Sequence, residues 1–134
     1  QYLSVVNCVT RNSSGFGFAG NAYDRMSRYT NCLAKNCTGA GFQYCNNLSS
    51  CAVDGENATN DGFRICRNLS ACVAHDCVES GFANCGYLSA CDADGSALFG
   101  VSGCYNLSSC HVSGATQEYF NCTTPSTYPS ESSD

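Results

Sequence analysis

The chain has 134 residues, thirteen of them cysteine, and contains no tryptophan. Six Lys and Arg against eleven Asp and Glu give a formal net charge of −5, and no basic stripe is present that could neutralise nucleic-acid phosphates. Apolar runs are only a few residues long, which excludes a membrane-spanning helix. Low charge and abundant Ser, Asn and Gly favour an all-β chain. We expect neither nucleic acid nor a membrane as its partner.

A repeat of 18 to 21 residues runs through the chain. Residues 1–8 read as the end of one copy, and residues 22–34 as a degraded copy with Met26 in the place of the first cysteine and Tyr29 in the place of the leucine. Four full copies follow: GFQYCNNLSSCAV (41–53), GFRICRNLSACVA (62–74), GFANCGYLSACDA (81–93) and GVSGCYNLSSCHV (100–112). A last copy begins with EYFNC at residues 118–122. The stretch between motifs varies in length, which predicts a loop there.

A unit of this size is too small to bury an apolar face alone, and it closes a core only by stacking on its neighbours. The residues Cys51-Ala52-Val53 and their counterparts alternate with a period of two, which is typical of a short strand whose first and third residues point inward. We therefore predict an all-β parallel β-helix, or solenoid, of about six coils over residues 1–122. Residues 123–134 are a Ser/Thr/Pro-rich C-terminal tail without a core pattern.

Stacking predicts columns of like side chains inside the solenoid. One column contains Phe42, Phe63, Phe82 and Val101, with Tyr23 and Tyr119 at its ends. A second contains Leu48, Leu69, Leu88 and Leu107. Two cysteine columns contain Cys45, Cys66, Cys85 and Cys104, and Cys32, Cys51, Cys72, Cys91 and Cys110. The Gly before each Phe is expected at a corner that needs positive φ or close chain approach, and Asn47, Asn68 and Asn106 at another corner in the left-handed conformation.

The pattern GFxxCxNLSxCxA resembles the right-handed parallel β-helix repeats of bacterial and phage surface proteins, and it is distantly similar to the NosD and pectate-lyase groups. The resemblance covers roughly residues 1–122 and implies a right-handed coil. It implies little about activity, because that superfamily includes lyases, phage tailspikes, adhesins and inert spacers.

An odd number of cysteines leaves at least one thiol unpaired or paired between chains. Their Cys-x5-Cys spacing differs from the CxxC spacing of zinc and redox sites, so we expect packing and neither a metal nor a cofactor. Successive coils are expected about 4.8 Å apart, a spacing that allows disulfides such as Cys45–Cys66 or Cys72–Cys91. A ladder of reduced thiols is equally consistent with the sequence. The density of cysteine favours an extracellular location, at a cell or virion surface.

The polar residues give weaker predictions. His75 and His111 are expected on outward or loop positions rather than as metal ligands. Glycan cleavage needs two positioned carboxylates, but no neighbouring coil repeats the Asp92/Asp94 pair and no Lys or Arg clusters beside it, so we expect no enzyme. The carboxylates considered are Asp54, Glu56, Asp61, Asp76, Glu79, Asp92 and Asp94.

Seven N-x-S/T sequons are glycosylation acceptors in a glycosylating source. They start at Asn12, Asn36, Asn47, Asn57, Asn68, Asn106 and Asn121. Three of them arise from the repeated Asn-Leu-Ser motif, in which Asn is favoured for its backbone conformation, so we favour a structural reason for those.

Neither end of the predicted solenoid carries an amphipathic capping helix, and open coil edges recruit other chains. We expect head-to-tail association with copies of itself or with neighbouring coils of a longer fibre. The predicted assembly residues are Tyr2, Leu3, Val5 and Cys8 at one end and Tyr119, Phe120 and Cys122 at the other. Cys8 and Cys122 are the candidates for locking the joint.

These features predict a non-enzymatic structural subunit of an extracellular fibre or surface appendage, assembled by end-to-end stacking of coils. One alternative is a phage tail-fibre or adhesin segment that binds surface glycans through exposed tyrosines such as Tyr44, Tyr87 and Tyr105. A second alternative is a degenerate polysaccharide lyase or hydrolase.

Overall fold

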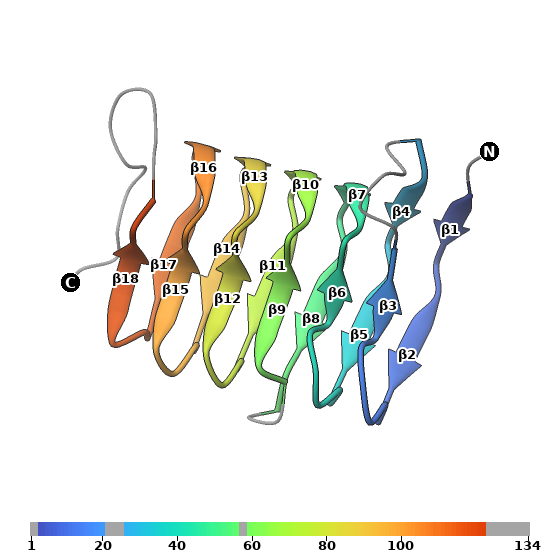
Figure 1. Cartoon of the computed structure of the whole chain (residues 1–134), viewed down its shortest axis with the longest axis horizontal. Helices are drawn as coiled ribbons and strands as arrows, with labels where there is room; N and C mark the ends of the chain where they lie inside the picture. The colour runs from blue at the N-terminus through green and yellow to red at the C-terminus, as the bar shows by residue number, and fades with distance from the viewer. Residues whose placement is uncertain (1–2, 21–25, 57–58, 123–134) are drawn as a thin grey trace.

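The computed structural model describes residues 3–20, 26–56 and 59–122, which form a parallel β-solenoid (Figure 1). These residues are strands joined by turns and bends, and none of them is helical. No helix in this part of the chain is therefore long and apolar enough to cross a membrane. The all-β parallel β-helix expected from the repeat is confirmed.

Each coil contributes one short strand to each of three parallel sheets, and each sheet has six strands. Sheet A contains β1 (Ser4–Val6), β4 (Arg28–Thr30), β7 (Asn46–Ser49), β10 (Arg67–Ser70), β13 (Gly86–Ser89) and β16 (Tyr105–Ser108). Sheet B contains β2 (Val9–Arg11), β5 (Leu33–Lys35), β8 (Ala52–Asp54), β11 (Val73–His75), β14 (Asp92–Asp94) and β17 (His111–Ser113). Sheet C contains β3 (Phe18–Ala19), β6 (Phe42–Gln43), β9 (Asp61–Arg64), β12 (Ser80–Ala83), β15 (Phe99–Ser102) and β18 (Gln117–Phe120).

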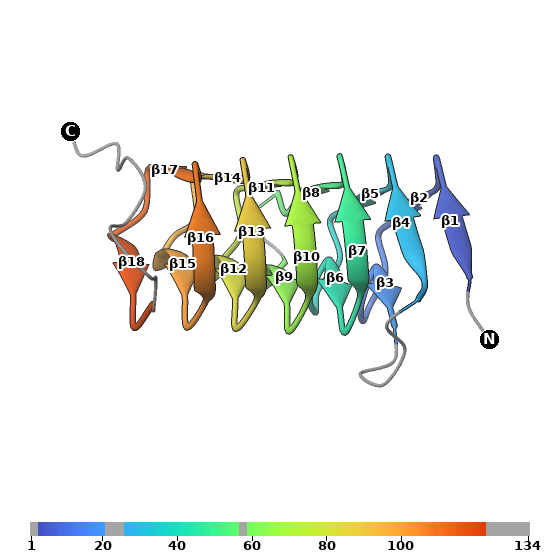
Figure 2. The same ribbon diagram turned by 90° about the horizontal axis from the view of Figure 1, so that it is seen from above.

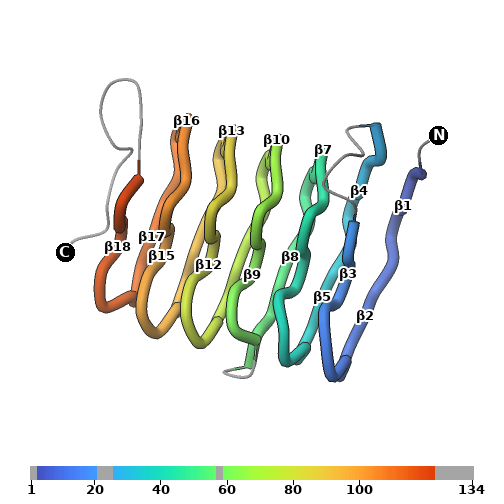
Figure 3. Tube along the Cα trace, in the orientation of Figure 1, coloured from blue at the N-terminus to red at the C-terminus, as the bar shows by residue number. Residues whose placement is uncertain are grey.

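The coils follow one another along the long axis in sequence order (Figures 2 and 3), so position in the sequence becomes position along the rod. The first coil is β1–β3 and the last coil is β16–β18. Each sheet begins in the first coil and ends in the last coil, so the described solenoid holds whole coils only.

An aromatic column runs through the centre of sheet C. Phe42, Phe63 and Phe82 are in register, are fully buried, and have nearly parallel rings whose centroids lie 5.0 and 4.9 Å apart. Phe18 stacks on Phe42 at 4.7 Å and begins the column. The prediction that Tyr23 occupies this position was wrong, because residues between Phe18 and Tyr29 are inserted relative to the later copies; Tyr23 itself lies outside the described residues.

Two further inward columns complete the core. In sheet A the register joins Val5, Tyr29, Leu48, Leu69, Leu88 and Leu107. In sheet B it joins Thr10, Ala34, Val53, Ala74, Ala93 and Val112. The small residues of the sheet B column bring that sheet close to sheet C, since they leave little side chain between the two.

That close approach explains the Gly before each Phe. A Cβ on Gly62 would lie 2.6 Å from the carbonyl oxygen of Gly81 and 2.8 Å from Cβ of Ala74. Positive φ, the other reason expected for these glycines, does not apply, because none of the four has it. The four are Gly41, Gly62 and Gly81, each before a Phe, and Gly100, which precedes Val101.

Left-handed backbone occurs instead at several non-glycine positions of each coil. Asn47, Asn68 and Asn106 have φ of 58°, 59° and 56°, as expected, but they lie inside β7, β10 and β16 rather than at a corner. The register of sheet A skips these residues, so each is a local kink in its strand. The true corners are the residues before the cysteines, such as Ile65 at φ 53° and Ala71 at φ 55°.

Candidate functional site

The thirteen cysteines are all free thiols, and eleven of them are buried. In one column Cys66 Sγ donates to the carbonyl oxygen of Phe42 in the preceding coil at 3.4 Å, and Cys85 Sγ donates likewise to Phe63 at 3.2 Å. Cys51 in the other column donates to Tyr29 at 3.3 Å. Each of these thiols therefore hydrogen-bonds an inward residue of the preceding coil.

The disulfides considered from the spacing, Cys45–Cys66 and Cys72–Cys91, are not formed. Parallel stacking separates equivalent Cβ atoms by about the 4.8 Å strand spacing, whereas a disulfide needs about 3.5–4.5 Å between Cβ atoms. The structure thus has the other arrangement that the spacing allowed, a ladder of reduced thiols.

Burial keeps the thiols of one column protonated. It raises the pKa of the Cys66, Cys85 and Cys104 thiols well above the ordinary value. Burial, with the nearby carboxylates of Asp61, Asp76 and Asp54, raises the pKa of Cys77 to about 12. A neutral thiol is a poor nucleophile and a poor metal ligand, so these four thiols are packing elements. In the other column, hydrogen bonds with neighbouring thiols lower the pKa of Cys51 and Cys91.

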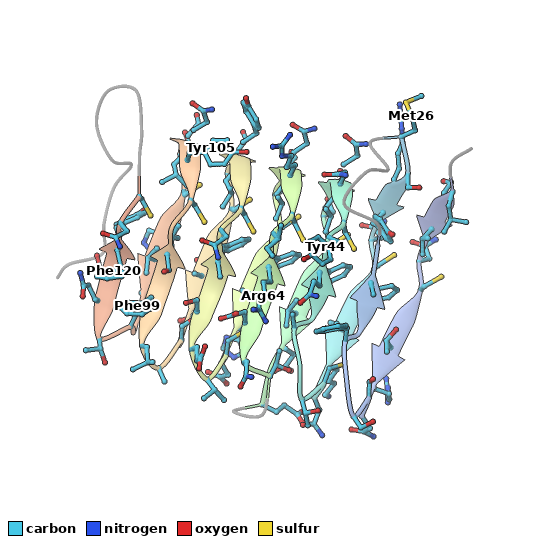
Figure 4. All side chains as sticks on the ribbon, in the orientation of Figure 1. Met26, Tyr44, Arg64, Phe99, Tyr105 and Phe120 are labelled. Atoms are coloured by element: carbon cyan, nitrogen blue, oxygen red, sulfur yellow. The ribbon has the colours of Figure 1, made fainter. Side chains whose placement is uncertain are left out.

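The two end coils continue the columns and have a described coil on one side only. Val5, Phe18, Tyr119 and Cys122 pack against the core but are only partly buried. On the first coil Leu3, Val6 and Val9 are 57%, 50% and 53% exposed. On the last coil Phe120 stacks on Phe99 with ring centroids 4.6 Å apart (Figure 4). Tyr2, the remaining predicted assembly residue, lies outside the described residues.

Cys8 and Cys122 belong to different columns. Leu33 N–H donates to the carbonyl oxygen of Cys8, which places Cys8 under the column that ends at Cys110. Cys122 Sγ donates to the carbonyl oxygen of Val101 at 3.4 Å and so extends the other column. A coil added in register would bring Cys8 to Cys110 and not to Cys122, so the predicted Cys8–Cys122 lock does not fit the geometry.

The outer face of sheet A carries a shallow hollow of about 540 Å³. Arg28, Asn47 and Asn68 are among its lining residues, and Asn68 Nδ2 donates to Asn47 Oδ1 at 3.3 Å. Tyr87 and Tyr105 continue this face, with ring centroids 5.4 Å apart and edge-on. Tyr44 lies apart from them, at the corner between β6 and β7 (Figure 4).

The predicted glycosylation acceptors are spread over the solenoid. Asn12, Asn68 and Asn121 are exposed, whereas Asn36, Asn47 and Asn106 are half-buried. Asn36 Nδ2 donates to Asn12 Oδ1 at 2.9 Å. Asn57 lies outside the described residues.

The carboxylates considered for glycan cleavage have different surroundings. Asp61 is buried and accepts the N–H of Ser80 at 3.1 Å, and burial together with Glu79 raises its pKa. Glu56 lies 3.4 Å from Lys35. Asp92 lies beside His111 on sheet B.

Asp54, Asp76 and Asp94 gather around His75 on the same sheet. Both histidines face outward, as expected from the sequence, since each is more than 45% exposed in its side chain. The grouping around His75 was missed, because its members come from different copies of the repeat. Aligning the copies of the repeat would have revealed the grouping. The position directly after the inward residue of sheet B holds Asp54, His75 and Asp94 in three successive coils.

Among known proteins, no family model matches the chain, and no curated protein matches it. Two solved structures are similar to it, both of QnrB1, a plasmid-mediated fluoroquinolone resistance protein. Full-length QnrB1 is 12% identical with a TM-score of 0.26, over 89% of this chain and 83% of QnrB1. A trypsin-treated variant is 13% identical with a TM-score of 0.25, over 91% and 81% of the two chains. Both likenesses concern the fold alone.

Proposed function

We propose that this chain is a non-enzymatic structural subunit of an extracellular fibre or surface appendage, and that it assembles by end-to-end stacking of copies of itself. The observation that carries the proposal is the pair of end coils, which have a described coil on one side only. All three sheets stop at the same two coils, and the partly buried residues there hold the column positions that are fully buried elsewhere. Open sheet edges with apolar side chains favour pairing with another chain.

Stacking in register would continue every column across the joint. The first coil of one copy would follow the last coil of another, so β1 would pair with β16, β2 with β17 and β3 with β18. Val5 would then meet Leu107, and Phe18 would meet Tyr119. The contact joins two different surfaces, so it is heterologous and repeats without closing, which yields a filament.

The distribution of charge supports this polarity. Among the described residues, positions 3–40 contain three Lys and Arg and no Asp or Glu, whereas positions 68–122 contain five Asp and Glu and no Lys or Arg. Because sequence order becomes axial order, the described solenoid is basic towards its first coil and acidic towards its last coil. Head-to-tail contact brings unlike charges together, and contact between two like ends is repulsive.

Two variants that each block one end test the proposal. Val5→Lys buries a charge at the head joint and Tyr119→Lys does so at the tail joint, whereas Ser70→Lys, on the exposed outer face of sheet A, is the matched control. We expect filaments from the wild type and from Ser70→Lys, and none from either blocked variant alone. Mixing the two blocked variants gives one heterodimer, because each retains one open end.

Light scattering coupled to size exclusion reads the masses, and circular dichroism verifies the fold of each variant. A wild type that stays monomeric at every concentration overturns the proposal. So does a blocked variant that still polymerises.

The glycan-binding alternative has one observation in its favour. The hollow on sheet A combines hydrogen-bonding Asn and Arg side chains with the exposed ring of Tyr87 beside it, and aromatic faces with polar neighbours suit sugars. Glycan binding is the second candidate, because the hollow is a shallow feature of one sheet, whereas all three sheets end at the end coils. If the wild-type protein is monomeric in the size-exclusion experiment, glycan binding becomes the favoured function.

A further inference from the structure

Three adjacent strands of sheet B place metal-ligating side chains in one outward row. Asp54 on β8, His75 on β11 and Asp94 on β14 are register partners. Asp76 follows His75 at a corner, where its φ of 55° turns the chain. Four potential ligands from three different coils therefore lie within a small area.

From this row we propose a binding site for a divalent transition-metal ion of the zinc class, held by Asp54, His75 and Asp76. One ligand atom from each of the three lies within 4.8 Å of the others. His75 Nε2 lies 3.2 Å from Asp76 Oδ2. Ligands about 2.0–2.1 Å from a tetrahedral ion are about 3.3 Å apart, so this pair already has the spacing of a coordination edge. One imidazole with carboxylates suits zinc and its neighbours better than calcium or magnesium.

The other ring nitrogen of His75 has a partner of its own. His75 Nδ1 lies 3.3 Å from Asp94 Oδ2, and Ser113 Oγ donates to Asp94 Oδ1 at 2.9 Å. Metal-bound histidines in proteins usually donate their second N–H to a carboxylate that is itself hydrogen-bonded, which fixes the ring orientation. Asp94 and Ser113 form such a relay, and it turns Nε2 towards Asp76. The contacts from Ser113 through Asp94 to His75 Nδ1 are thus a second observation, separate from the three proposed ligands.

Charge and access also suit a cation. Asp54, Asp76 and Asp94 bring three carboxylates to the row, and the ammonium of Lys35, the cation in register with Asp54, lies 3.4 Å from Glu56. The side chains of His75 and Asp76 are 46% and 37% exposed, so an ion can enter from solvent and keep a water as its fourth ligand.

His111 provides an internal comparison. It lies 3.6 Å from Asp92 on the same face of sheet B, but no third ligand joins the pair: among the described residues only the Asp54–His75–Asp76 group brings three ligands together. His111→Ala is therefore the matched control for His75→Ala, since both remove an exposed imidazole beside a carboxylate.

Titration of the reduced, metal-free protein with Zn²⁺ in a calorimeter tests the site, and Co²⁺ absorption identifies the ligands. We expect one saturable ion per chain, loss of binding in His75→Ala and Asp76→Asn, and wild-type binding in His111→Ala. Asp94→Asn acts through His75 and weakens binding by about 10–100-fold. The Val5→Lys variant binds equally well, because the site is independent of assembly.

Three results overturn the site. They are the absence of saturable binding by the wild type, unchanged binding in His75→Ala, and a thiolate-to-cobalt charge-transfer band, which would assign the ion to the cysteines.

Discussion

The middle coils and the end coils share the same inward columns and differ in their neighbours. In the middle, Phe63, Leu69 and Ala74 each have an equivalent residue above and below and are at most 1% exposed. At the first coil, Val5 and Phe18 hold equivalent positions with a described strand partner on one side only, and they remain partly exposed. Stability in this molecule therefore comes from the stack rather than from any single coil, and it is lowest where the stack stops.

The largest expected effect comes from removing a ring in the middle. Phe63→Ala deletes a fully buried side chain with stacked rings on both sides, and we expect a loss of about 3–5 kcal/mol in the free energy of unfolding. Phe18→Ala, at the end of the same column, should cost about 1 kcal/mol because its side chain is already partly exposed. Urea unfolding measures both. Equal losses would contradict the dependence on neighbours.

A second large effect distinguishes the buried thiols from the exposed one. Burial raises the pKa of Cys66, Cys85 and Cys104 well above the ordinary value of 9.0. Above pH 9 these thiols ionise in the unfolded chain but stay protonated in the folded one. The fold therefore loses stability as the pH rises above 9. At pH 10 the cost is about 1.4 kcal/mol for each thiol. Urea midpoints at pH 8 and pH 10 under reducing conditions measure it.

The control for this experiment is Cys8→Ala, which removes the exposed thiol of the first coil and should leave the pH dependence unchanged. A protein equally stable at both pH values would contradict the buried, reduced ladder.

The smallest effect concerns a corner, where the strain is local and stacking plays little part. Ile65 is β-branched and has a φ of 53°, whereas Asn84 and Gly103 occupy the equivalent corners of the next two coils. Left-handed backbone costs most residues about 1–2 kcal/mol, so Ile65→Asn should raise the free energy of unfolding by about 1 kcal/mol. Asn84→Ile is the reverse control and should lower it similarly. A loss in Ile65→Asn would show that packing of Ile65 outweighs its strain.

The repeat predicts the interior well and the exterior poorly, for a physical reason. Stacking constrains Phe42, Phe63 and Phe82 to one residue type, so their column is visible in the sequence as a motif. Phe18 was missed because an insertion follows it and breaks the spacing that identifies the later copies. Outward positions carry no such constraint: Asp54, His75 and Asp94 share a row but not a residue type, so no motif marks them.

The disulfide question shows a second limit. Spacing along the chain indicates which cysteines stack, but the separation of their Cβ atoms depends on the parallel geometry, which only the structure provides. The kinks at Asn47 and Asn68 are similar: the residue type predicts left-handed backbone, and the register shows that it lies within a strand.

Electron microscopy of the purified wild-type protein tests end-to-end assembly most directly. Six coils at about 4.8 Å each predict unbranched filaments one solenoid wide, with a subunit repeat of roughly 29 Å along the axis. Raising the salt concentration should shorten them, because the basic and acidic ends attract each other. Isolated particles of single-subunit size at every concentration would contradict the account.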